Sequence, residues 1–240
     1  MKLRIRHSKL GKIRFTSHRD TASHWERAVR KADVPLAYSA GFTPRPRMSF
    51  GLALPTGAES LAEYLDVELA PGTHHDLDEL RTRFGVALPV GYEVTHVVER
   101  DPAAPSLQED VVACTWLLAL EGVDPERVQS GIDATLDSTM LMVERERKGQ
   151  RSTDDVRPAI LDLSMVWATD DPRPHLCAML ATNGRGLRPL ELIAAMFPAL
   201  DPVDATARVL RTQQWIERDG TRREIIPAMS VATCTPVECA

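Results

Sequence analysis

The spacing of apolar residues changes repeatedly along the first hundred residues, and this constrains the fold more than any other feature. Residues 3–9 alternate apolar and basic side chains, which is the period of a half-buried strand, and the alternation resumes at 13–15. Residues 18–32 instead repeat apolar side chains at helical spacing. Ser17 and Asp20 stand at the two positions of a capping box, which predicts a helix start. The chain therefore begins with a strand followed by a helix.

The same periodicities continue to residue 100. They predict a second helix at 76–84 and further strands at 48–54, 62–69 and 92–98. The resulting order, β-α-β-β-α-β, is that of a ferredoxin-like unit. Residues 101–105, rich in Pro and Ala, indicate a linker.

The second half repeats a comparable series, although no sequence repeat accompanies it. Residues 208–215 fit either a strand or a helix. Strands are predicted at 111–120, 140–147, 155–166 and 175–181, and helices at 124–136 and 189–197. We therefore expect an α+β protein of two ferredoxin-like (βαββαβ) halves in tandem. The expected divisions are a basic domain at 1–100, a linker at 101–107, a second domain at 108–230 and a tail at 231–240.

Positive charge is concentrated at one end of an acidic chain. The net charge is −5, yet residues 1–50 hold 12 Lys/Arg and 3 Asp/Glu, a net of +9. The remaining 190 residues hold 17 Lys/Arg and 31 Asp/Glu, a net of −14. Such asymmetry points to an anionic partner for the basic segment. The alternative is that the basic residues pair with the acidic remainder.

The totals also exclude several protein classes. An apolar fraction of 43% with 26% charged residues is ordinary for a globular protein. No apolar run approaches a membrane span or a secretory signal. The cysteines form no C-x-x-C pair, so neither zinc nor an iron–sulfur cluster is indicated; they are Cys114, Cys177, Cys234 and Cys239. We expect a cytoplasmic protein with no cofactor, no bound metal and no membrane partner.

Aromatic residues accompany the basic ones near residue 40. Pro44-Arg45-Pro46-Arg47 predicts a stiff loop that presents two guanidinium groups, which match phosphate oxygens. Nearby Tyr38 and Phe42 are suited to stacking on unpaired bases. The alternative places Phe42 in the core. The predicted RNA-binding set is Arg4, Arg6, Lys12, Arg14, Arg19, Tyr38, Phe42, Arg45 and Arg47.

His18 and Asp20 are the one candidate acid–base pair. His18 falls near a helix start, where the helix dipole lowers the pKa of an imidazole. A histidine with nearby cations is able to cleave RNA without metal. The alternative is that Asp20 and Ser17 serve as helix caps and His18 makes a structural contact. His74-His75-Asp76 similarly favours a loop and a helix cap over a metal site.

Several stretches of the first third resemble the radical-SAM-linked domain family of unknown function. They are residues 13–20, 26–32, 35–44 and 63–67, with weaker matches at 157–158 and 186–190. The chain is similar to the stand-alone actinobacterial type, which is often encoded near RNase E/G. The resemblance implies association with RNA metabolism or with a radical SAM partner. No C-x-x-x-C-x-x-C motif is present, so the chain itself carries no radical SAM cluster.

Arg45 departs from the family pattern, which usually has a histidine at this position. An arginine neither exchanges protons near neutral pH nor binds a metal, whereas it binds anions well. We therefore expect a non-catalytic RNA-binding or adaptor protein in RNA processing or modification. One alternative is a metal-independent endoribonuclease or RNA-modifying enzyme that uses His18 and Asp20. The other is a protein-interaction module for a radical SAM enzyme or RNase E/G.

Overall fold

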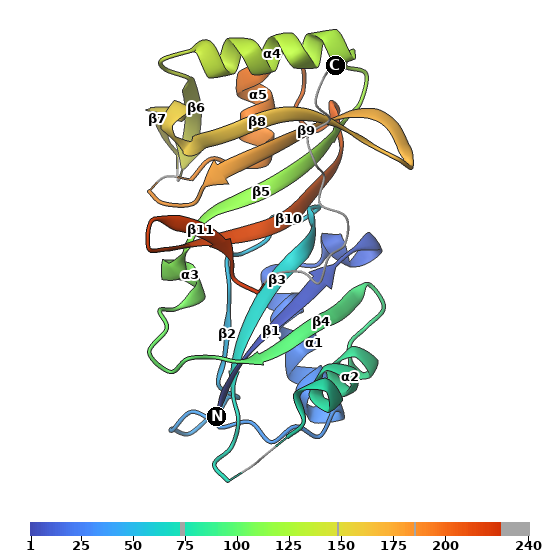
Figure 1. Cartoon of the computed structure of the whole chain (residues 1–240), viewed down its shortest axis with the longest axis vertical. Helices are drawn as coiled ribbons and strands as arrows, with labels where there is room; N and C mark the ends of the chain where they lie inside the picture. The colour runs from blue at the N-terminus through green and yellow to red at the C-terminus, as the bar shows by residue number, and fades with distance from the viewer. Residues whose placement is uncertain (73–74, 148, 185, 227–240) are drawn as a thin grey trace. The chain divides into compact units, whose positions relative to one another are not determined.

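The computed structural model shows a mixed α+β chain whose strands pair mostly in antiparallel fashion (Figure 1). The structure describes residues 1–72, 75–147, 149–184 and 186–226. His74, Arg185, Cys234, Cys239 and the expected tail at 231–240 lie outside the described residues. None of the described helices is both long and apolar enough to cross a membrane.

The chain divides into two compact units. Unit 1 comprises Met1–Val111 and takes in the later segment Glu224–Ala228, which is described to residue 226. Unit 2 begins at Val112 and runs to Arg223. The return of residues 224–226 to unit 1 differs from the expected second domain of 108–230.

The described part of unit 1 contains four strands, two longer helices and one short helix. The strands are β1 (Lys2–Lys9), β2 (Met48–Phe50), β3 (Glu59–Glu68) and β4 (Tyr92–Glu99). The helices are α1 (His18–Lys31), α2 (Leu77–Ala87) and the short α3 (Leu107–Asp110). β1 lies between β4 and β3, and β2 pairs with β3. Each of these pairs is antiparallel.

Helix α1 begins where the capping box predicts. The Ser17 side chain accepts a hydrogen bond from the Asp20 backbone N–H, and the Asp20 carboxylate accepts one from the Ser17 N–H. The strand predicted at 13–15 is wrong. Gly11–Phe15 instead forms the 3-10 helix η1, entered through Gly11 at a φ of +70°. Three residues of alternation are too few to distinguish a strand from a 3-10 turn.

Both faces of the unit 1 sheet are covered. Trp25 of α1 and Phe84 of α2 pack edge to face on one side, with ring centroids 5.8 Å apart, over Leu3 and Ile5 of β1. The opposite face carries a second cluster of Ala62, Tyr64, Leu107 and Ile226. As a result, seven of the eight β1 residues are buried.

Unit 2 contains β5 (Val111–Leu120), α4 (Pro125–Asp137), β6 (Met142–Arg147), β7 (Gln150–Asp155), η2 (Arg157–Ala159), β8 (Ile160–Ala168), β9 (Asp171–Ala181), α5 (Pro189–Met196), β10 (Thr206–Arg218) and β11 (Thr221–Glu224). The order of neighbouring strands is β10-β5-β9-β8, β11 pairs with β10, and β6 and β7 form a separate hairpin. Residues 208–215, which periodicity left open, lie in strand β10. The strand predicted at 155–166 starts later, because a 3-10 turn containing Pro158 precedes it.

Candidate nucleic-acid interface

Arg4 is buried in an ion pair and is not presented to solvent. Its Nε and Nη2 donate to the two carboxylate oxygens of Asp66 at 2.7 and 2.8 Å. The Arg100 Nε lies 3.0 Å from the same carboxylate. Asp66 therefore neutralises part of two guanidinium groups on the side of the sheet opposite α1 and α2.

Arg6 is held in the same way by the segment that returns from unit 2. Its Nη2 donates to Glu224 Oε1 at 2.7 Å, and its Nη1 donates to the Ile226 carbonyl at 3.1 Å. Arg4 and Arg6 are 7% and 4% exposed. These facts correct the expectation of an arginine-lined strand face for RNA. β1 is flanked by strands and covered on both faces, so its polar side chains are paired internally.

The segment from Leu36 to Arg47 forms a projecting loop whose base is held by backbone hydrogen bonds. We call it the 36–47 loop. Its two arms approach at the bridge between Tyr38 and Pro46. The Ser39 N–H donates to the Arg45 carbonyl at 2.9 Å, and the Arg47 N–H donates to the Ala37 carbonyl at 2.8 Å. The Arg45 N–H also donates to Ser39 Oγ at 3.1 Å. The loop is therefore ordered by contacts at its base.

Aromatic and basic side chains extend from this loop into solvent. Phe42 is fully exposed at 111% and Tyr38 is 51% exposed. Arg45 is exposed, and Arg47 is half exposed while its Nη1 lies 3.2 Å from Glu68 Oε2. The alternative that Phe42 belongs to the core is wrong. The loop brings together four of the nine residues predicted to bind RNA.

The other predicted cations are dispersed over the start of the chain. Lys12 in η1 and Arg19 in α1 are exposed. Arg14 lies 3.7 Å from Glu59 and stacks over the Phe15 ring at 4.7 Å. It is thus partly neutralised, in line with the expectation that some arginines pair with acidic residues.

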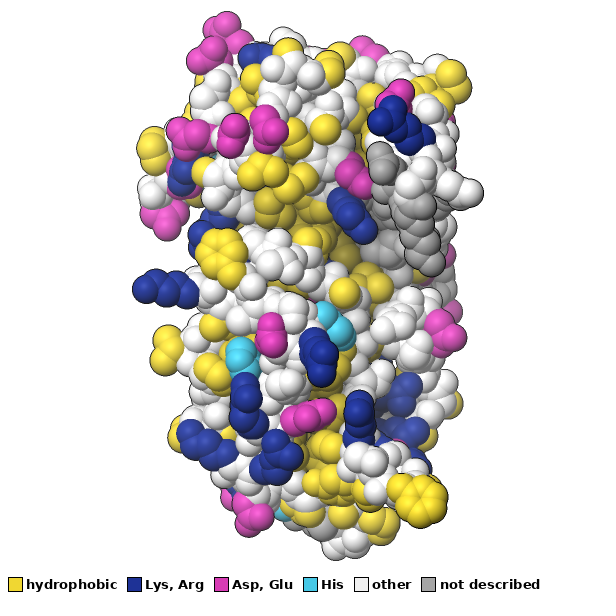
Figure 2. Space-filling model, turned by 180° about the vertical axis from the view of Figure 1, so that it is seen from behind, with side chains coloured by type: hydrophobic (Ala, Val, Ile, Leu, Met, Phe, Trp, Pro, Cys, Tyr) yellow, Lys and Arg dark blue, Asp and Glu magenta, His cyan; other side chains and the backbone are white. Residues whose placement is uncertain are grey.

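A basic face on α1 was missed by the sequence reasoning. Arg19, Arg27 and Arg30 are all exposed, and their spacing of eight and three residues keeps them within about 80° of one another around the helix. Figure 2 shows Lys and Arg side chains gathered over unit 1 in its lower half, with histidines among them. The signal was available, because a helical wheel of residues 18–31 groups these three arginines.

His18 and Asp20 do not form an acid–base pair. The Ser17 N–H and hydroxyl both donate to Asp20 Oδ2, at 3.2 and 2.7 Å. These hydrogen bonds lower the pKa of Asp20 below its ordinary value. The His18 ring instead packs edge to face on Phe50, with centroids 5.4 Å apart. Asp20 therefore caps the helix, whereas the neighbours of the His18 side chain are residues of the strands.

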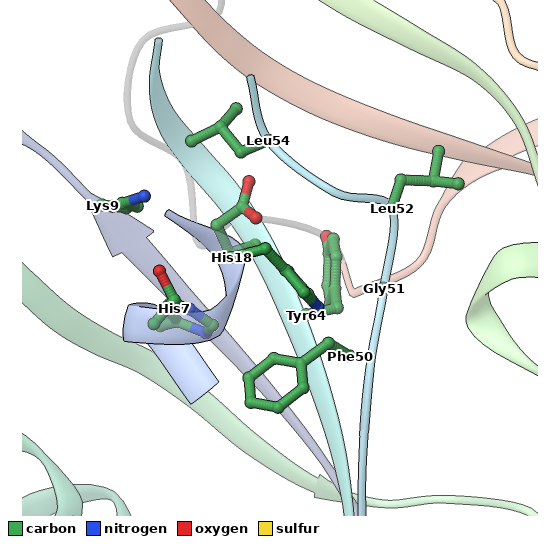
Figure 3. Close-up of a pocket in the computed structure, with 10 residues that line it drawn as sticks. His7, Lys9, His18, Phe50, Gly51, Leu52, Leu54 and Tyr64 are labelled. Carbon is green, nitrogen blue, oxygen red and sulfur yellow. The ribbon is translucent and has the colours of Figure 1, made fainter. Parts of the chain in front are cut away.

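Those neighbours form a small pocket in unit 1, which we call the His18 pocket. In Figure 3, His7 and Lys9 extend from β1, Tyr64 from β3 and Phe50 from β2 around the His18 side chain. The pocket has a volume of about 20 Å³. Its floor is polar and buried, since His7 and Lys9 are 1% and 2% exposed. Burial also raises the pKa of Tyr64 well above its usual range.

Sequence periodicity did not single out His7, Lys9 or Tyr64. The β1 register shifts between His7 and Lys9 against β3 and between Arg6 and His7 against β4, which interrupts the simple alternation. The Lys9 ammonium donates to the Thr16 carbonyl at 2.9 Å. A buried lysine and histidine beside an exposed histidine give a site at which proton transfer is chemically possible.

Metal ligands do not cluster in the described part of the chain. Asp76 caps α2, where its Oδ1 accepts from the backbone N–H groups of Asp78 and Glu79 at 2.8 and 3.0 Å. Of the two histidines that precede it, His75 is described and half-buried. Asp76 therefore acts as the N-cap of α2.

Comparison with known proteins places the chain in a family. No curated protein matches it. Among solved structures, a chain in the "Crystal Structure of a Cbf5-Nop10-Gar1 Complex" is similar at 10% identity with a TM-score of 0.45. That alignment covers 88% of this chain and 48% of the other, so the chain spans about half of that neighbour's length. A family described as "Uncharacterized protein conserved in bacteria" matches residues 2–189. This match covers most of the sequence, and the chain therefore belongs to the DUF2344 family.

Proposed function

We propose that this protein binds single-stranded RNA through unit 1, as a non-catalytic RNA-binding or adaptor protein in RNA processing or modification. The observation that carries the proposal is Phe42, a fully exposed aromatic ring on a loop whose base is hydrogen-bonded. A fully exposed ring on an ordered loop, beside a second exposed ring at Tyr38 and the guanidinium of Arg45, has the composition of a surface on which bases stack.

The chemistry around Phe42 suits RNA. Stacking of a base on an aromatic ring contributes about 1–3 kcal/mol and tolerates any base. Tyr38 offers a second ring, and Arg45 and Arg47 offer guanidinium groups for the phosphates between stacked bases. Pro44 and Pro46 limit the backbone freedom that binding would otherwise remove.

The exposed face of α1 supplies a further attraction for a polyanion. Its arginines lie on a surface rather than in internal ion pairs, unlike Arg4 and Arg6. Positive potential of this kind accelerates the encounter with RNA and holds its backbone without selecting a sequence. The loop would then select unpaired bases.

We further propose that both units are ferredoxin-like, as the sequence predicted. Strand orders β4-β1-β3 with β2 on β3, and β10-β5-β9-β8, support this. In each unit the helices stand at equivalent places in the chain, and β6–β7 would be a hairpin inserted into the second unit. The four cysteines are few and widely spaced, unlike the dense cysteine pattern of a secreted disulfide scaffold, which supports a cytoplasmic location.

Electrophoretic mobility of a fluorescent single-stranded RNA tests the main proposal. We expect binding at low salt that weakens as salt is added, because phosphate contacts release counterions. The double variant Phe42→Ala with Arg45→Ala should bind at least about tenfold more weakly, since it removes one stack and one phosphate contact. Thr43→Ala, in the same exposed loop, is the control. Absence of binding at low salt, or insensitivity to both salt and the double variant, contradicts the proposal.

A second candidate function is metal-independent RNA cleavage or modification at His18. The observation in its favour is the His18 pocket, where a buried lysine, a second histidine and a tyrosine surround the exposed imidazole. Labelled RNA should be incubated with the wild type and with His18→Ala in the presence of EDTA. Products from the wild type and none from the variant support this candidate, and identical patterns end it.

A third candidate is a protein-interaction module for a radical SAM enzyme or RNase E/G, with the stand-alone radical-SAM-linked type as its family context. An exposed Phe42 fits a protein pocket as well as a base. Capture of either enzyme that survives nuclease treatment and is lost in Phe42→Ala favours this candidate. Capture that is lost on nuclease treatment would mean that RNA links the two proteins, which supports RNA binding instead.

A further inference from the structure

A larger pocket opens in unit 1 beside the base of the 36–47 loop. We call it the Arg100 pocket. It has a volume of about 310 Å³ and is lined by Lys2, Arg47, Ser49, Asp66, Arg100 and Ser106, among others. This volume falls at the lower end of the range of about 300–1,000 Å³ for small-molecule sites. Residues from four parts of unit 1 meet there, namely the start of β1, β2, the end of β3 and the segment after β4.

The charges at this pocket do not cancel. Asp66 is shared by Arg4 and Arg100, and Glu68 pairs with Arg47. Lys2 adds another cation to the lining. Three cations line the pocket beside two carboxylates; Arg4 lies behind Asp66 as a fourth cation, and Glu109, which accepts from Ser106, adds a third carboxylate. The surplus is about one positive charge, which attracts a phosphomonoester with its roughly 1.5–2 negative charges at neutral pH.

Arg100 is fixed in place before any ligand arrives. Its Nη2 donates to the carbonyls of Ala104 and Pro105, and its Nε faces Asp66 at 3.0 Å. The side chain is 12% exposed. A guanidinium held in a poorly solvated position attracts an anion more strongly than one free in water, and its ordering has already been achieved by folding.

We propose that the Arg100 pocket binds the phosphate group of a nucleotide. The surplus charge and the fixed guanidinium select the phosphate, with the exposed Ser49 hydroxyl as a further donor. The volume exceeds that of the phosphate and leaves room for the attached sugar. Arg47 belongs to both the pocket and the loop. The inference rests on the proposed function where the phosphate is the end of an RNA strand, whereas a free mononucleotide would fill the same site.

Two sets of ligands separate these sources. Adenosine 5′-monophosphate, inorganic phosphate and adenosine are titrated by calorimetry. RNA oligonucleotides with a 5′-phosphate or a 5′-hydroxyl are compared by fluorescence anisotropy. We expect binding of the monophosphate but not of adenosine, or tighter binding of the phosphorylated oligonucleotide. The first result identifies a free nucleotide as a ligand, and the second identifies a strand end.

The variants Lys2→Glu and Ser49→Asp place a carboxylate in the pocket. Either should weaken phosphate-dependent binding about tenfold, because a favourable contact to the phosphate, ionic at Lys2 and a hydrogen bond at Ser49, is replaced by repulsion. Arg81→Glu makes the same charge change as Lys2→Glu at an exposed position of α2 outside the pocket lining and should have little effect on that preference. Thermal melting of each variant checks that it remains folded. If one pocket variant fails to fold, the other still tests the proposal.

The outcomes distinguish this proposal from the previous one. Oligonucleotides that bind with no preference for a terminal phosphate, together with no binding of the monophosphate, overturn the Arg100 pocket and leave RNA binding by the loop intact. Monophosphate binding that is lost in Lys2→Glu, with no oligonucleotide binding at all, supports the pocket and contradicts the RNA proposal. Phe42→Ala should weaken oligonucleotide binding and leave monophosphate binding unchanged.

Discussion

Asp66 is the residue on which the polar side of the unit 1 sheet depends most. Its carboxylate is 12% exposed and faces two guanidinium groups. Asp66→Asn would leave Arg4 and Arg100 buried without their counter-charge. We expect the free energy of unfolding to fall by about 3–5 kcal/mol, as when one partner of a buried ion pair is removed. Urea unfolding of the variant measures this loss.

The exposed pair between Arg47 and Glu68 provides the control for that measurement. Glu68→Gln removes a carboxylate of the same strand, but its guanidinium partner is half exposed. The expected change in the free energy of unfolding is under about 1 kcal/mol. Equal losses in the two variants would contradict the distinction drawn between buried and exposed ion pairs in unit 1.

Phe42 allows a graded test of stacking. Phe42→Trp enlarges the ring, and Phe42→Ala removes it. RNA affinity should follow the order Trp, Phe, Ala, with the alanine variant weaker than the wild type by about fivefold or more. Thermal stability should hardly change across the series, because the side chain is fully exposed. Fluorescence anisotropy gives the affinities, and an unchanged affinity in Phe42→Ala argues against stacking.

Sequence could predict the loop residues but not the fate of the strand residues. Phe42 and Arg45 are in a Pro-flanked segment whose local chemistry already indicates an exposed loop. Arg4 and Arg6 alternate with apolar residues, which shows that they share a face but not what covers that face. Their partners Asp66 and Glu224 are 62 and 218 positions away. No local pattern contains that information.

At the scale of elements, the contribution of the α1 start to the stability of the fold depends on pH. The hydrogen bonds from Ser17 hold the pKa of Asp20 below its ordinary value of 3.8. Because the folded-state pKa is the lower one, the charged carboxylate stabilises the folded state above the ordinary value. That contribution is lost as the pH falls through the folded pKa.

The prediction is therefore a stability difference between the wild type and Asp20→Asn that is constant above about pH 5 and narrows in acid. Urea unfolding at pH 7, 5 and 3 measures it. Asp78→Asn, an exposed acidic residue in the first turn of α2, is the comparison. A difference for Asp20→Asn that grows in acid has the wrong sign and contradicts the capping role.

The turn into β4 depends on a glycine. Gly91 has a φ of +103°, and a Cβ there would lie 2.7 Å from the Leu10 carbonyl oxygen. Gly91→Ala should destabilise the fold by about 2 kcal/mol or more, through backbone strain and this contact. Gly85→Ala, in α2 with open space around it, should instead stabilise by about 0.5–1 kcal/mol. Thermal unfolding of both variants checks the opposite signs.

Element prediction succeeded where the signal was long and failed where it was short. The helix at 18–32 was confirmed because the capping box and several turns of apolar spacing agree. Residues 13–15 offered three residues of alternation and formed a 3-10 turn. Residues 208–215 form a strand because they pair with β5. Periodicity within a segment gives no information about its pairing with a distant strand.

At the scale of the whole molecule, the charge asymmetry of the sequence largely disappears on folding. Residues 1–50 carry a surplus of cations, but Met1–Val111 contains 15 Lys/Arg and 15 Asp/Glu. Much of the surplus is matched by acidic residues of β3 such as Glu59, Asp66 and Glu68. The positive regions that remain are local, which is why the proposals rest on one loop, one helix face and one pocket.

The division into units predicts the effect of a truncation. A chain ending at Arg223 lacks Glu224 and Ile226, the partners of Arg6 and part of the cover over Tyr64. We expect faster amide hydrogen exchange in β1 and β3, because a buried guanidinium loses its counter-charge and apolar surface is exposed. Exchange in β8 and β9 of unit 2 serves as the internal control. Unchanged protection in β1 would show that the returning segment is dispensable.

That returning segment also sets an order of events during synthesis. Residues 1–111 leave the ribosome first, yet the piece that covers Tyr64 and pairs with Arg6 is made after all of residues 112–223. At about 5–20 residues per second, the delay is on the order of 10 s. During that interval the nascent chain carries an unfinished N-terminal unit whose buried arginine has no counter-ion. A ribosome stalled just before residue 224 would therefore hold an N-terminal unit that is still incomplete, although all of unit 2 up to that residue has been made.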